Sequence, residues 1–126
     1  FNLKNIESII KNKKNITFEE IVRTLYKETG NIEASFSSKL LATINPNMPI
    51  WDQYVLKNLD FKVSGYSKDK RIESVIETYN KIVERENKLL SESFFKKCVH
   101  EFKDYFSYYD LTDIKILDYI LWSTRK

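Results

Sequence analysis

The chain has very few residues that form tight turns. Only two of its 126 residues are glycine and two are proline. β-Hairpins and other tight turns depend on these residues, so a protein with many short strands would need more of them. Apolar residues instead recur at three- and four-residue spacing along most of the chain, which is typical of amphipathic helices. The sequence therefore predicts an all-α fold.

Length and composition favour one folded domain. A chain of 126 residues that is 42% hydrophobic and 14% aromatic has enough apolar surface for one core. We find no internal repeat, low-complexity segment or linker, so residues 1–126 are predicted to form a single compact helical domain. The first residue is Phe1 and not Met, which we interpret as the mark of a processed or excised chain.

Several classes of protein are excluded by simple counts. No apolar run approaches the ~18–20 residues of a membrane span, and no signal-peptide pattern opens the chain. One cysteine, Cys98, allows no internal disulfide, so we expect a cytoplasmic protein. One histidine, His100, leaves no metal-ligand spacing, and neither a metal nor an organic cofactor is expected. A net charge of +3 permits contact with nucleic acid without arguing for it, and the oligomeric state is not indicated.

Local signals divide the chain into about seven predicted helices. They cover residues 3–10, 17–30, 31–45, 52–59, 68–90, 91–106 and 112–122. The sharpest start is the capping box of Thr17 and Glu20, with Gly30 as the stop. Asp52 and Thr112 are expected as helix caps, and either Ser91 or Ser93 is expected to cap the sixth helix.

Two segments leave alternatives open. Residues 31–45 form either one helix or two short ones that break at Ser37 and Ser38 and restart at Lys39. The last predicted helix is apolar almost all round, which indicates burial against several neighbours. Its polar stripe, Lys115 and Asp118, is either a pair on the helix surface or part of a groove.

One stretch combines a lysine at a predicted helix start with a proline turn and an aspartate at the next helix start. The sequence reads Ser-Ser-Lys-Leu-Leu-Ala over residues 37–42 and Met-Pro-Ile-Trp-Asp-Gln-Tyr-Val over residues 48–55. Over about residues 30–58 the chain resembles the helix-hairpin-helix, Gly/Pro-Asp superfamily of base-excision DNA glycosylases, particularly the 8-oxoguanine branch. The resemblance implies a glycosylase-like domain for DNA repair, either active or degenerate.

The resemblance assigns a role to each end of this stretch. Lys39 matches the catalytic lysine, whose amine attacks C1′ of the deoxyribose and forms a Schiff base. Asp52 matches the catalytic aspartate, whose carboxylate stabilises the positive charge that develops on the sugar. Both side chains must then face one concave pocket.

The same resemblance implies further contacts with a partner, double-stranded DNA. Ser37 and Ser38 stand where the family has a glycine-rich hairpin that binds a phosphate, so their hydroxyls or the helix end are expected to replace it. Trp51 and Tyr54 are candidates for stacking on an extruded base.

Plainer interpretations of the same residues remain. Asp52 after a proline turn also suits a helix cap, Lys39 a solvated surface lysine, and Trp51 a core anchor. The alternative function is a non-catalytic helical module that binds a protein or nucleic acid through basic helix faces. A structural helical domain excised from a larger protein is a third.

Overall fold

The computed structural model of the chain describes residues 15–107 and 109–124. These residues form six α-helices and no β-strand, which confirms the all-α prediction for the described chain. The helices are α2 (Phe18–Thr29), α3 (Ala34–Ile44), α4 (Gln53–Leu59), α5 (Lys68–Ser91), α6 (Ser93–Tyr105) and α7 (Asp113–Ser123). The helix predicted at residues 3–10 lies outside the described residues. None of the described helices is long and apolar enough to cross a membrane.

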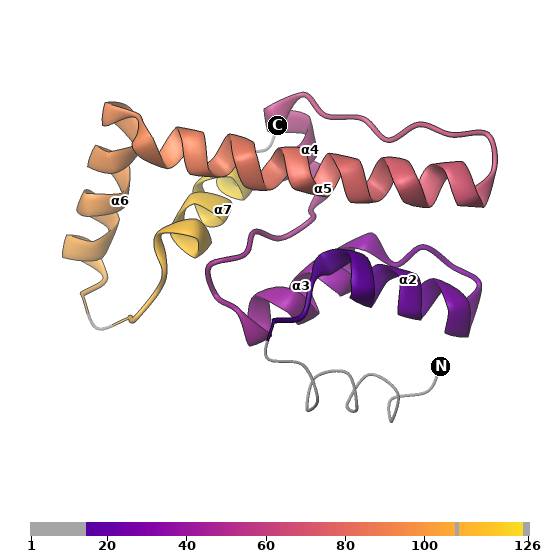
Figure 1. The fold of residues 1–126 in the computed structure, drawn as a ribbon. Coiled ribbons are helices and arrows are strands. Elements are labelled where there is room, and N and C mark those ends of the chain that lie inside the picture. Colours follow the sequence, from indigo (N-terminus) through magenta and orange to yellow (C-terminus); the bar gives the residue numbers. More distant parts are fainter. Residues whose placement is uncertain (1–14, 108, 125–126) are drawn as a thin grey trace.

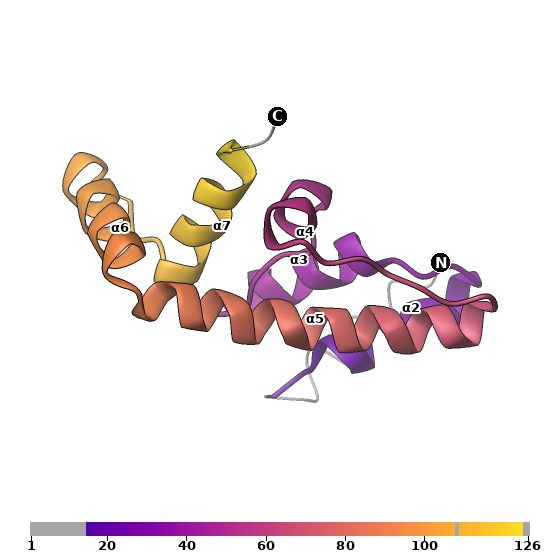
Figure 2. The same cartoon turned by 90° about the horizontal axis from the view of Figure 1, so that it is seen from above.

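Helix α5 is the element around which the others are arranged. Its 24 residues give a length of about 36 Å at ~1.5 Å per residue. Figure 1 shows α2 and α3 side by side as a hairpin along the first half of α5, with α6 leaving its far end. Figure 2 shows α7 returning between α6 and α4, so that α7 packs on both helices as well as on α5.

Most helix ends follow the predicted capping chemistry. The Thr17 hydroxyl accepts the backbone N–H of Glu20 at 3.2 Å, and Gly30 ends α2 in the left-handed conformation with φ 75°. Asp52 and Thr112 cap α4 and α7 through their side chains, as predicted.

The predicted cap of α6 is wrong. Ser91 ends α5, where its hydroxyl donates to the carbonyl of Lys88, and Ser93 is already the first residue of α6. Glu92 stands at the cap position, and no side-chain cap bond forms there between residues of the described chain. Helix α6 therefore begins without a side-chain cap from the described residues.

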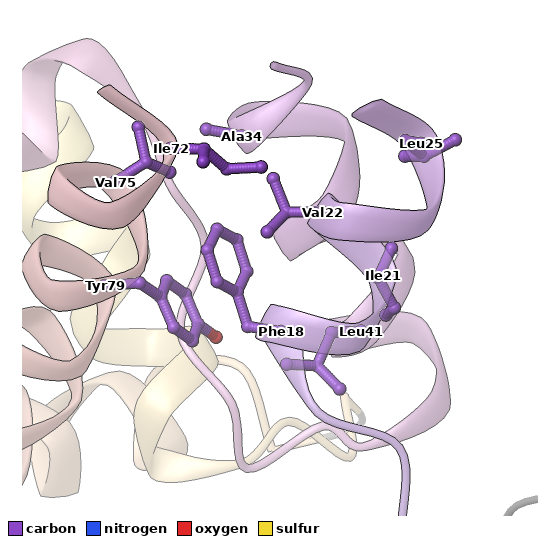
Figure 3. Close-up of a cluster of buried hydrophobic side chains, with 9 residues drawn as sticks. All are labelled: Phe18, Ile21, Val22, Leu25, Ala34, Leu41, Ile72, Val75 and Tyr79. Carbon is purple, nitrogen blue, oxygen red and sulfur yellow. The ribbon is translucent and has the colours of Figure 1, made fainter. Parts of the chain in front are cut away.

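The first core cluster joins α2, α3 and the first half of α5. Figure 3 shows its side chains converging between the helices. The rings of Phe18 and Tyr79 stack with centroids 4.0 Å apart and planes 13° from parallel. The buried members of the cluster are Phe18, Ile21, Val22, Leu25, Ala34, Leu41, Ile72, Val75 and Tyr79.

The second core cluster lies where α4, α7 and the middle of α5 meet. Its buried members are Val55, Leu59, Ile82, Leu117 and Leu121. Trp51 packs against both clusters, and its ring lies 6.5 Å from that of Phe18. The segment at residues 45–52 therefore crosses the molecule at the junction of the two clusters.

Candidate functional site

A pocket of about 390 Å³ opens where α3, α7 and the segment at residues 45–52 meet. This size falls within the range of about 300–1,000 Å³ that is common for ligand sites. Two lysines and two aspartates line it together with apolar side chains. The lining residues are Lys39, Ala42, Met48, Ile50, Asp52, Lys115, Asp118, Tyr119 and Trp122. We call this the Lys39–Asp52 pocket.

Lys39 reaches the pocket from the middle of α3. The helix runs unbroken from Ala34 to Ile44, so the one-helix alternative is correct and no helix restarts at Lys39. Lys39 is exposed, and its side chain lines the pocket at the solvent side of α3. Ala42, three residues later on the same face, contributes to the wall.

Asp52 reaches the pocket from the start of α4. Its Oδ1 accepts the backbone N–H of Tyr54 at 2.8 Å, which is the predicted cap. The residue is half-buried and its side chain also lines the pocket. Asp52 therefore combines the capping role with a position in the same pocket as Lys39.

Four side chains hold the segment that leads to Asp52. The Tyr79 hydroxyl donates to the Pro49 carbonyl at 2.7 Å, and Thr112 donates to the Pro46 carbonyl. The backbone N–H groups of Ile50 and Trp51 donate to Asp118 at 3.0 Å and to Ser38 at 2.6 Å. These side chains come from α3, α5, the α7 cap and α7, so three helices set the path of the segment.

The two serines lie in the interior. Ser37 and Ser38 are both fully buried in α3. The Ser38 hydroxyl donates to the Ser35 carbonyl and accepts the N–H of Trp51. The Ser37 hydroxyl has no hydrogen-bond partner within the described part of the chain. Because both side chains are fully buried, neither hydroxyl is placed where it could meet a DNA phosphate.

The aromatic side chains of the pocket also differ from those expected. Trp51 packs between the two core clusters, which agrees with the core-anchor interpretation. Trp51 and Tyr54 are not among the described residues that line the pocket, whereas Tyr119 and Trp122 of α7 are. Tyr119 and Trp122 are therefore the aromatic side chains that could stack on a planar ligand in this pocket.

A pair of buried carboxyl groups, Asp118 and Glu86, lies at the pocket, and Asp118 is the member that lines it. Asp118 is 5% exposed and Glu86, from α5, is fully buried. Burial raises the pKa of Glu86 far above its usual range, and a hydrogen bond to Asp118 raises it further. Burial also raises the pKa of Asp118, and the contact with Glu86 and the N–H of Ile50 lower it only in part, so that the net result is a rise to about 6. Lys115 lowers the pKa of Asp118 as well, while nearby Asp52 raises it.

The sequence offers two alternatives for Lys115 and Asp118, a surface pair or part of a groove, and the groove alternative is the correct one because both residues line the pocket. No role is predicted for Glu86 from the sequence. Glu86 follows Ile72 and Tyr79 at seven-residue intervals, so its position on the buried face of α5 was readable from the sequence. An acidic residue at such a position is a signal of a buried polar contact.

The described residues contain no metal site. Among residues 15–107 and 109–124, no group of three or more His, Cys, Asp or Glu side chains is placed to hold a metal ion. His100 is exposed and lies 3.3 Å from Asp104, one helical turn along α6.

Comparison with protein-family models, with curated proteins and with solved structures finds no match to this chain.

Proposed function

We propose that the chain is a DNA glycosylase-like domain whose site is the Lys39–Asp52 pocket. The observation that carries the proposal is that Lys39, from α3, and Asp52, from the start of α4, line the same pocket. The resemblance pairs these two residues by their order in the sequence alone. Their shared position is the geometric condition that the chemistry requires.

The chemistry divides between the two residues. As the bond from C1′ to the base breaks, the base leaves with the bonding electrons and positive charge builds on the sugar. The Asp52 carboxylate stabilises that charge. The Lys39 nitrogen forms a bond to C1′ with its lone pair, and one of its protons moves to the ring oxygen as the C1′–O bond breaks, which leaves a protonated Schiff base and a sugar hydroxyl.

An extruded nucleotide is the ligand class that suits the pocket. A base taken out of a duplex needs a concave site with apolar or aromatic walls and a few polar groups. Ile50 and Ala42 supply apolar surface, Tyr119 and Trp122 supply aromatic surface, and Lys39 and Asp52 supply polar groups. Double-stranded DNA is the proposed partner.

Covalent trapping tests the proposal. The protein is mixed with duplexes that carry oxidised, alkylated or deaminated bases, and borohydride is added to reduce any Schiff base to a stable amine. We expect an adduct with at least one duplex, and we expect Lys39→Ala to abolish it. Lys115→Ala is the matched control, because Lys115 is the other lysine of the pocket.

The outcomes separate the possibilities. An adduct that survives Lys39→Ala and disappears in Lys115→Ala would assign the amine to Lys115 and contradict the role of Lys39. Binding of damaged duplex without any adduct would leave a degenerate relative that recognises DNA and lacks the lysine chemistry.

A second candidate function is a non-catalytic binding module, and one feature favours it. An apolar groove of about 490 Å³ between α6 and α7 adjoins the Lys39–Asp52 pocket, with Lys115 and Tyr119 in both walls. Its other lining residues are Phe102, Phe106, Tyr109 and Leu111.

Titration of duplex DNA at low and moderate salt discriminates between the two functions. If the chain binds DNA through phosphate contacts, its affinity for the duplex should fall steeply as salt is added. If it is a module that binds a protein through the apolar groove, we expect no affinity for the duplex at either salt concentration.

A further inference from the structure

The pair of Glu86 and Asp118 has too few hydrogen-bond donors if both groups are ionised. Asp118 Oδ2 accepts the backbone N–H of Ile50 at 3.0 Å. Both oxygens of Glu86 and Oδ1 of Asp118 are buried with no donor from any described residue. An unpaired buried carboxylate is strongly unfavourable, so two of them side by side are not a stable arrangement.

One proton reduces the deficit to the single carbonyl oxygen of Glu86. The two carboxyl groups lie within hydrogen-bonding reach of each other. A proton on Glu86 lets its O–H donate to Asp118, which gives Asp118 a donor on the side away from Ile50. The proton belongs on Glu86 because Asp118 has stabilising neighbours in Lys115 and the Ile50 N–H, while Glu86 is fully buried and Asp118 beside it disfavours a second negative charge.

The other polar groups that face the pair fit this assignment. Tyr79, one α5 heptad before Glu86, is buried, and its hydroxyl donates to the Pro49 carbonyl and not to either carboxyl group. Asp52 adds negative charge near Asp118 and Lys115 adds positive charge. A single negative charge on Asp118 thus lies near Lys115, one turn earlier on α7, and both residues line the pocket.

The charged Asp118 acts on the segment that carries Asp52. It fixes the N–H of Ile50, two residues before Asp52, while Ser38 fixes the N–H of Trp51 between them. We propose that Glu86 and Asp118 form a proton-sharing pair that positions Asp52 in the Lys39–Asp52 pocket, with Glu86 orienting Asp118 and Asp118 orienting the backbone before Asp52. The catalytic part of this inference rests on the proposed glycosylase function; the shared proton and the backbone contact do not.

Infrared spectroscopy tests the shared proton without any substrate. At pH 7 the wild-type protein should show the C=O band of a protonated carboxyl group, and labelling glutamate with ¹³C should shift it. Glu86→Gln should remove the band. Glu84→Gln, at an exposed position on the same helix, should leave it in place. Absence of the band from the wild-type protein, or its persistence in Glu86→Gln, would overturn the proposal.

Amide hydrogen exchange at Ile50 tests the positioning role. Glu86→Leu fills the space but donates no hydrogen bond, so Asp118 should hold the Ile50 N–H less firmly and exchange should become roughly tenfold faster. Glu86→Gln should restore slow exchange, because its amide donates to Asp118 as the protonated carboxyl does. A structural packing role would give no difference between leucine and glutamine at this position, and that result would contradict the inference.

Base release gives the third readout, if the glycosylase function holds. Glu86→Leu should lower the rate of base release by about 10- to 100-fold through misplacement of Asp52, and Glu86→Gln should restore it. A wild-type protein that releases no base from any duplex contradicts the catalytic part of the proposed function. The infrared band and the Ile50 exchange rate test the carboxyl pair in either case. Unchanged base release in a folded Glu86→Leu protein would overturn the positioning role.

Discussion

The hydroxyl oxygen of Ser38 accepts the backbone N–H of Trp51 at 2.6 Å and ties the middle of α3 to the residue before Asp52. Its neighbour Ser37 is equally buried, yet its hydroxyl has no partner within residues 15–107 and 109–124. The two adjacent serines thus have opposite hydrogen-bonding environments at the same depth.

This contrast gives the first prediction. Ser38→Ala leaves a buried N–H without an acceptor and should lower the free energy of unfolding by about 1–3 kcal/mol. Ser37→Ala removes an unsatisfied hydroxyl and should be neutral or stabilising. Urea unfolding of both variants checks this. Equal losses in the two variants would show that the bond between Ser38 and Trp51 contributes little.

The second prediction concerns pH. The pKa of Glu86 is raised in the folded protein, mainly by burial. The unfolded chain ionises this group above about pH 4.3, while the folded protein keeps the proton. The contribution of Glu86 to stability is therefore complete below that pH and is lost as pH rises toward the folded-state pKa, by up to about 1.4 kcal/mol per pH unit.

Glu86→Gln should remove this dependence. Its free energy of unfolding should exceed that of the wild-type protein by more at pH 8 than at pH 5. Thermal melts across this range provide the measurement, with Glu84→Gln as the control because Glu84 is exposed. A constant difference between Glu86→Gln and the wild-type protein at all pH values would show that Glu86 is ionised in the fold.

The third prediction concerns the second core cluster. Leu117 is fully buried, so Leu117→Ala should cost roughly 2–5 kcal/mol in unfolding free energy. The sequence also predicts burial of Ile120, but that residue is only partly buried on the flank of α7. Ile120→Ala should therefore cost distinctly less. Chemical denaturation of the two variants measures the difference, and a loss below about 0.5 kcal/mol for Leu117→Ala would place α7 outside the core.

The fourth prediction concerns the tyrosine that holds the proline segment. Tyr79→Phe removes the buried donor to the Pro49 carbonyl and should lower the unfolding free energy by about 0.5–1.5 kcal/mol. Tyr26→Phe is the matched control, because the Tyr26 hydroxyl forms only a 3.4 Å contact with Asp69 at the surface. Its effect should stay within about 0.5 kcal/mol. Indistinguishable melts for both variants would argue against a structural role for the bond to Pro49.

Local signals predicted the helices well where the chemistry is contained in a few adjacent residues. The Thr17 cap, the Gly30 stop and the Asp52 cap depend only on side chains near the helix end, and all three are present. The cap of α6 was mispredicted because the Ser91 hydroxyl bonds back to the Lys88 carbonyl of α5, and Ser93 already belongs to α6. The two serines of α3 were ambiguous because a buried serine can stay helical when its hydroxyl bonds locally, as that of Ser38 does with the Ser35 carbonyl.

The site was predicted only as far as one continuous stretch of sequence reaches. Lys39 and Asp52 belong to that stretch, and both line the pocket. Asp118 and Glu86 lie on α7 and α5, and their meeting with the proline segment depends on how three helices pack. The periodicity of one helix shows which of its residues are buried, but not which residues of another helix they contact. The meeting of Asp118 and Glu86 could therefore not be predicted from the sequence.

The attachment of the proline segment to α7 has a consequence for how the protein is made. Thr112 and Asp118 contact Pro46 and Ile50 across 66 and 68 residues of chain. At a synthesis rate of about 5–20 residues per second, the segment leaves the ribosome about 3–14 seconds before the helix that fixes it. Throughout that interval Lys39 and Asp52 are both present in the nascent chain, but the wall that Asp118 and Trp122 contribute to their pocket does not yet exist. Any nascent or truncated chain that stops before Asp113 would carry both proposed catalytic residues and lack the site.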